Sequence, residues 1–108
     1  MHQLNFEYNG KSYGLEYTRE TVIMMERRGF KAQEVTEFPM SMLPELFAGA
    51  FLAHHRYESR KVIDEILDTI TNRRELVGKL SEMYNEPLNA MLNEPEETTG
   101  NVAWTANF

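Results

Sequence analysis

Cysteine is absent from this chain of 108 residues. Disulfides, thiolate nucleophiles and cysteine-ligated zinc sites are therefore excluded, and the absence fits a reducing compartment. No stretch approaches the roughly 18 consecutive apolar residues of a membrane-spanning helix. The first residues form neither a basic leader nor an apolar run of signal-peptide length. The sequence predicts a soluble, cytoplasmic protein of one domain.

Basic residues are fewer than acidic ones, 11 against 17, which gives a formal net charge of −6. A nucleic-acid-binding protein needs a basic face to neutralise phosphates, so this balance argues against that class. The basic residues occur in small groups where helices are expected to begin or end: Arg27, Arg28 and Lys31; Arg56, Arg60 and Lys61; Arg73 and Arg74. We interpret these groups as solvated helix ends, and we predict binding to neither nucleic acid nor membrane.

Residues with catalytic or metal-binding potential are also few. His54 and His55 are neighbours, so on a helix they would point about 100° apart and could not chelate one metal. We expect His54 to be partly buried and His55 to be solvated. Asp64 and Asp68 fit a solvated helix face. Because the sequence has no serine nucleophile elbow and no glycine-rich phosphate loop, it predicts a protein that is not an enzyme and uses no cofactor or metal.

The first 17 residues have the pattern of a β-hairpin. Apolar residues alternate with polar ones on both sides of Asn9-Gly10, a pair that tolerates the positive φ angles of a type I′ turn. A two-stranded hairpin is marginal in water, so its aromatic face must pack on another element. The sequence predicts a hairpin over residues 3–17.

Helical patterns follow over about residues 19–92. Thr18 is placed as an N-cap, and Gly29 as the left-handed residue that ends the first helix. Residues 31–41 are interpreted as a connector. A second, very apolar helix is expected after an N-cap at Ser41, with Pro44 in its first turn and apolar positions continuing to His54. We expect this helix at the centre of the core.

Two more helices are predicted before residue 92. Ser59 is placed to cap the third helix, and Asn72 and Glu75 have the spacing of a capping box that opens the fourth. Pro87 is expected to end or kink the fourth helix near Asn85. The fold class is therefore α+β, an N-terminal hairpin packed on a mainly helical, roughly four-helix domain over residues 1–92.

Residues 93–108 differ from the rest of the chain. They contain three acidic residues and no basic one, and they end in the alternating apolar pattern NVAWTANF. We interpret this segment as an acidic linker followed by an extended apolar tail, which could dock on its own domain, on a neighbouring copy or on a partner.

Four phrases carry a resemblance that covers nearly the whole chain. They are FEYNGKSYGLEYTRETVIMMERRGF, PMSMLPELFAGAFLAHHR, ITNRRELVGKLSEMYNEPL and GNVAWTANF. They are similar to the tail assembly chaperones of tailed phages and prophages of Gram-positive bacteria. The resemblance rests on these phrases and on no chemical motif.

The resemblance implies a function and partners. Proteins of that kind are encoded just before the tape-measure protein, coat this long apolar helical protein, keep it soluble in the host cytoplasm, and recruit major tail protein. The chain would act without catalysis, would self-associate as a homo-oligomer, and would be absent from the mature virion. The alternatives are a structural virion component, such as a head–tail connector or minor tail protein, and a small regulator that binds a host factor.

The candidate partner-binding residues come from this sequence and not from the resemblance. Seven methionines could fill a small core or could form an adaptable surface. The candidate protein-binding residues are Met42, Phe47 and Phe51 on the apolar helix and Trp104 and Phe108 in the tail. Packing within the chain is the competing interpretation for all five.

Overall fold

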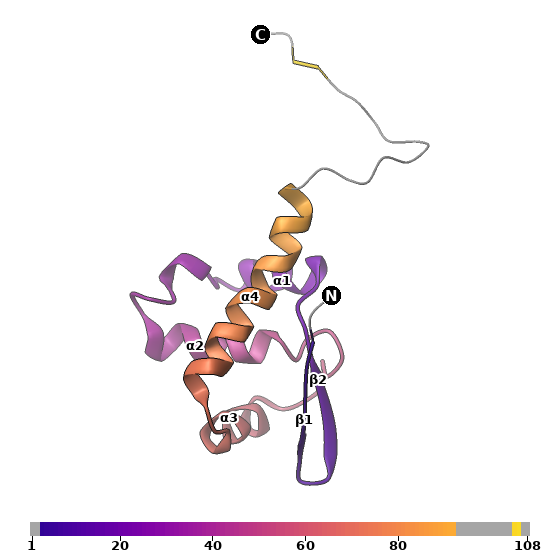
Figure 1. Ribbon diagram of the computed structural model, residues 1–108, viewed down its shortest axis with the longest axis vertical. Helices are drawn as coiled ribbons and strands as arrows, with labels where there is room; N and C mark the ends of the chain where they lie inside the picture. Colours follow the sequence, from indigo (N-terminus) through magenta and orange to yellow (C-terminus); the bar gives the residue numbers. More distant parts are fainter. Residues whose placement is uncertain (1–2, 93–104, 107–108) are drawn as a thin grey trace.

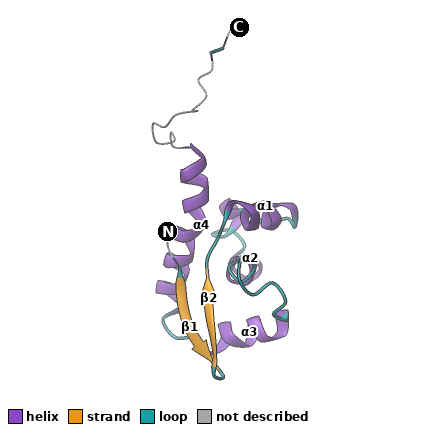
Figure 2. Ribbon diagram, turned by 90° about the vertical axis from the view of Figure 1, so that its right-hand side faces the viewer, coloured by secondary structure: helices purple, strands orange, loops and turns teal. Residues whose placement is uncertain are grey.

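A computed structural model of the chain describes residues 3–92 and 105–106. It contains an antiparallel hairpin followed by four α-helices, so the predicted α+β fold class is confirmed. The hairpin stands beside the helices in both ribbon views (Figures 1 and 2). The predicted acidic linker and almost all of the predicted tail lie outside the described residues.

The hairpin forms as the sequence predicts. Strand β1 (Leu4–Tyr8) pairs with β2 (Lys11–Leu15) in antiparallel register, with Phe6 opposite Tyr13. Asn9 and Gly10 have φ angles of 50° and 77°, the left-handed values that a type I′ turn requires at both central positions. The Phe6 and Tyr13 rings stack with their centroids 5.3 Å apart.

Helix α1 (Arg19–Arg27) has both predicted ends. The Thr18 hydroxyl accepts a hydrogen bond from the Thr21 amide, and the Thr21 hydroxyl accepts one from the Thr18 amide. Gly29 follows the helix with a φ of 96°. The amides of Gly29 and Phe30 donate to the carbonyls of Glu26 and Met25, which is the Schellman pattern. This ending turns the buried Phe30 ring back onto the core.

Helix α2 (Pro39–Gly49) begins and ends earlier than predicted. The prediction of an N-cap at Ser41 is wrong, because Pro39 itself occupies the first helical turn, where its fixed φ suits a helix and its missing N–H needs no partner. The short 3₁₀-helix η1 (Ala32–Glu34) lies in the predicted connector. The predicted helical continuation to His54 is also wrong, because residues 50–54 form turns.

Helix α3 (Arg60–Thr69) begins after Ser59, whose hydroxyl accepts from the Val62 amide as predicted. Helix α4 (Arg73–Leu92) does not have the predicted capping geometry. Asn72 has a φ of 54°, whereas an N-cap residue is normally extended. Pro87 lies inside α4 rather than ending it. The last turns of α4 extend beyond the other helices (Figure 1).

The core lies around α2, the central position that its apolar sequence predicts. This helix contacts α1, α3 and α4, and the loop after it packs against the hairpin. Phe51 is in edge-to-face contact with Tyr13, with ring centroids 5.7 Å apart, and with Phe47 at 5.2 Å. Such aromatic pairs stabilise a fold by about 0.5–1.5 kcal/mol beyond their burial. One continuous core therefore joins the hairpin to the helices.

Candidate protein-binding groove

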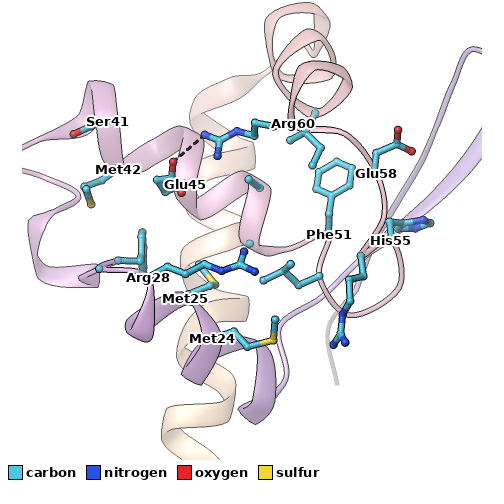
Figure 3. A pocket seen from close by; sticks show the side chains of 17 residues that line it. Met24, Met25, Arg28, Ser41, Met42, Glu45, Phe51, His55, Glu58 and Arg60 are labelled. Atoms are coloured by element: carbon cyan, nitrogen blue, oxygen red, sulfur yellow. Dashed lines mark hydrogen bonds and ion pairs between the residues drawn. The ribbon is translucent and has the colours of Figure 1, made fainter.

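A groove of about 530 Å³ lies between α1, α2 and the loop that joins α2 to α3. We call it the Met groove, because three methionines line it (Figure 3). Met24 and Met25 come from the last turns of α1, and Met42 comes from the first turns of α2. The Schellman ending of α1 fixes one end of the groove, since Gly29 and Phe30 are also part of its lining.

The floor of the groove is shaped by close packing of α1 on α2. Met25 is 3% exposed and lies against Gly49, where a side chain would overlap the Met25 thioether. Met24 and Met42 are less buried than Met25. The thioether side chains are flexible and polarisable, so they can repack around partners of varied shape. The groove thus combines a fixed floor with two adaptable walls.

The loop over residues 50–59 forms the far wall and is fastened to the hairpin. The Glu16 amide donates to the Ala50 carbonyl at 3.2 Å, and the Gly14 amide donates to His55 Nε2 at 3.0 Å. The Tyr13 hydroxyl donates to Glu58 Oε2 at 2.9 Å. These three bonds hold the loop at its beginning, middle and end.

The Glu58 carboxylate accepts hydrogen bonds from two residues of the hairpin. The Lys11 ammonium donates to the same oxygen at 2.9 Å. The hydrogen bonds from Lys11 and then from Tyr13 lower the pKa of Glu58 below its ordinary value. The pKa of Lys11 is raised, chiefly by its hydrogen bond to Glu58, and the pKa of Tyr13 is raised by burial and then by the same carboxylate. Glu58 therefore stays ionised at neutral pH and is compensated within the domain.

The two histidines exchange the environments predicted for them. His54 is exposed, and its Nε2 lies 2.7 Å from Glu16 Oε2. His55 is half-buried and packs on the Tyr13 ring with centroids 4.9 Å apart. The prediction is wrong because it requires a continuous helix through both residues. Burial, followed by the charge of Lys11, lowers the pKa of His55, so it accepts the Gly14 hydrogen bond as a neutral imidazole.

The ionic groups around the groove leave a local excess of positive charge. Arg60 donates to Glu45 and to Asp64, each at 3.0 Å, so this arginine is already paired. Arg28 and Arg56 also line the groove, and neither forms an ion pair with another of the described residues. In Figure 3 the Arg28 side chain extends from α1 into the groove. Two uncompensated guanidinium groups thus lie on a protein of net charge −6.

The predicted partner-binding residues fall in different places. Met42 and Phe51 both line the groove, but Phe51 is only 1% exposed and, like Phe47 at 1%, belongs to the core. Trp104 and Phe108 lie outside the described residues. Sequence patterns alone do not group Met24, Met25, Arg28 and Arg56 into one surface. The spacing of Met24, Met25 and Arg28 on one helix is a usable signal, but pairing it with Arg56 requires the loop geometry.

Other kinds of site have little support in the described part of the chain. Residues 3–92 and 105–106 contain no group of three or more potential metal ligands. Among the same residues, no helix combines the length and the apolar character needed to cross a membrane.

Together, the fold and the groove define a small α+β domain with a candidate protein-binding surface between two helices. Residues 1–108 match a family described as a domain of unknown function (DUF5055), and the chain belongs to that family. No curated protein and no solved structure matches the chain.

Proposed function

We propose that this chain is a non-catalytic tail assembly chaperone of a tailed phage or prophage. It binds the tape-measure protein in the bacterial host cytoplasm and keeps it soluble while the tail tube forms. It self-associates along that protein, recruits major tail protein, and is absent from the mature virion. The resemblance carried by the four sequence phrases supports this proposal.

The Met groove is the structural observation on which the proposal rests. A chaperone of a long helical protein must accept many different apolar helix faces in turn. Methionine side chains suit that task because they repack at low cost, as in other surfaces that bind varied helices. The groove walls provide two such side chains, Met24 and Met42, on helices that a buried core holds in place.

Co-expression with the long helical protein encoded downstream tests the proposal. The expected result is that the partner becomes soluble and copurifies with several copies of the full chain, as measured by the mass of the complex. A Met24→Ser/Met42→Ser variant should lose this effect. A Met40→Ser variant is the matched control, because Met40 is 91% exposed and lies outside the groove.

Two results would contradict the proposal. The partner could remain insoluble in the presence of the chain, or both methionine variants could solubilise it equally well. Recovery of the chain from purified phage particles, in a fixed number of copies, would instead favour a structural component of the virion.

A further inference from the structure

The charge of the Met groove is opposite to the charge of the protein. The charged residues that line it are three arginines and two glutamates. Arg28 and Arg56 form no ion pair with another described residue, while Arg60 is shared between Glu45 and Asp64 and Glu58 is paired with Lys11. His55 adds no charge near neutral pH, because its pKa is lowered by burial. A ligand that enters the groove therefore meets an apolar floor and two guanidinium groups, although the chain as a whole would attract cations.

The size of the groove limits what can enter. A helix about 10 Å in diameter occupies roughly 420 Å³ per turn of 5.4 Å. The groove volume of about 530 Å³ is close to that of a single helical turn, so the groove has room for one apolar face of a helix rather than for a whole helix. Such a helix would present apolar anchors at positions i, i+3, i+4 and i+7 to the methionines, which is the usual helix-in-groove mode.

We propose that the Met groove binds an amphipathic helix whose apolar stripe is flanked by carboxylates, with those carboxylates paired to Arg28 and Arg56. The apolar stripe contacts Met24, Met25 and Met42. The inference rests on the proposed function in one respect, that the helix is a segment of the tape-measure protein. The two arginines select acid-flanked segments among the apolar faces of that protein.

Guanidinium groups suit this selection for a physical reason. Arginine binds carboxylates in a planar, two-pronged geometry and keeps its charge at any physiological pH. Each pair at the edge of a groove stabilises a complex only modestly, but a like charge in the same place is repelled. The two arginines therefore add little to the affinity for an acid-flanked helix, and their main effect is to disfavour a helix with basic flanks.

The test uses two fluorescein-labelled helical peptides of about 18 residues, roughly five helical turns, with the same leucine stripe. One has glutamates on both flanks and the other has lysines. Fluorescence anisotropy with the full chain should show about tenfold tighter binding of the glutamate peptide, which corresponds to about 1.4 kcal/mol. The chain has a net charge of −6, so non-specific electrostatic attraction would favour the lysine peptide and cannot produce a preference for the glutamate peptide. Added salt should reduce the preference.

Charge-reversal variants test whether Arg28 and Arg56 cause the preference for the glutamate peptide. An Arg28→Glu/Arg56→Glu variant should bind the glutamate peptide about tenfold more weakly and the lysine peptide more tightly. An Arg73→Glu/Arg74→Glu variant makes the same change in net charge at the start of α4, outside the groove, and should behave as the wild type. If the first variant fails to fold by circular dichroism, Arg28→Gln and Arg56→Gln replace it.

Several outcomes would overturn the proposal. They are tighter binding of the lysine peptide, equal effects of the two double variants, and no binding of the glutamate peptide at millimolar concentration. A synthetic peptide of residues 93–108 that displaces the glutamate peptide and binds more tightly would identify the chain's own end as the occupant instead. Failure of the co-expression assay with a positive peptide assay would reject the tape-measure partner and leave the acid-flanked helix in place.

Discussion

Tyr13 and Glu58 are 45 residues apart in the sequence and are joined by a hydrogen bond of 2.9 Å between the tyrosine hydroxyl and Oε2 of the carboxylate. Tyr13 is 4% exposed, so its hydroxyl has little access to water. The bond ties the second strand of the hairpin to the loop that forms the far wall of the Met groove. A change at this bond should therefore affect the stability of the domain and the shape of the groove together.

The first prediction concerns the coupling of these two residues. Tyr13→Phe and Glu58→Ala should each lower the free energy of unfolding by about 1 kcal/mol. The double variant should lose less than the sum, because both single changes remove the same bond. Urea denaturation of the wild type and the three variants measures the difference. Strict additivity of the two changes would mean that the bond does not stabilise the fold.

The second prediction is a dependence of stability on pH through His55. Its pKa is lowered in the folded state, chiefly by burial and then by the charges of Lys11 and His54, while Glu58 acts in the opposite direction. The unfolded chain therefore binds the proton at a higher pH than the folded chain does. Neutral His55 therefore contributes to the free energy of unfolding. This contribution is complete above about pH 6.5, the pKa of histidine in the unfolded chain. It is lost as the pH falls from there through the lower pKa of the folded state.

Melting temperatures between about pH 7.5 and pH 5, an interval that spans the ordinary histidine pKa, measure this effect. A His55→Gln variant is the control, because its side-chain carbonyl can accept from the Gly14 amide but does not titrate. The melting temperature of the wild type should fall more steeply over this interval than that of the variant. Parallel curves for the two proteins would exclude His55 as the titrating group.

The third prediction separates the core from the candidate surface. Phe51 is 1% exposed and contacts Phe6, Tyr13 and Phe47. Phe51→Ala should therefore lower the free energy of unfolding by about 3–5 kcal/mol, a large part of the total for a domain of this size. Met40→Ala should change it by less than about 0.5 kcal/mol, since Met40 is 91% exposed. Similar losses in the two variants, measured in urea, would contradict this assignment of the core.

Local signals are sufficient to predict much of this fold. The hairpin is predictable because Asn9-Gly10 is flanked by alternating strands, and Thr18, Ser59 and Gly29 mark helix ends because capping depends on neighbouring residues only. The groove is not predictable in this way. Its residues come from α1, α2, the loop that follows α2 and the first turn of α3, and the loop that carries Arg56 is bonded to the hairpin through His55.

Two of the differences between prediction and structure, the earlier end of α2 and the environments of the two histidines, have a common physical cause. The apolar spacing from Leu43 to Phe51 suits a helix, but it equally suits a helix followed by tight turns that bury the same residues. The bonds to the hairpin decide between these structures, since His55 must reach the Gly14 amide. The same ambiguity makes Phe47 and Phe51 candidates for partner binding, because an apolar pattern alone does not distinguish a core face from an exposed apolar face.

The last prediction compares the same substitution at two glycines. Gly29 has a φ of 96° and ends α1, so a side chain there strains the backbone, and Gly29→Ala should lower the free energy of unfolding by about 1–2 kcal/mol. Gly78 lies within α4, and a methyl group added there would meet nothing within 4 Å beyond its own stretch of helix backbone, so Gly78→Ala should raise the free energy of unfolding by about 0.5–1 kcal/mol. Urea denaturation should thus give shifts of opposite sign. Because Gly29 also lines the Met groove, Gly29→Ala should weaken binding of the glutamate peptide, whereas Gly78→Ala should leave it unchanged. An unchanged or raised free energy of unfolding in Gly29→Ala would show that the ending of α1 is not held in the left-handed conformation, whereas a loss in Gly78→Ala would contradict only the expectation for α4.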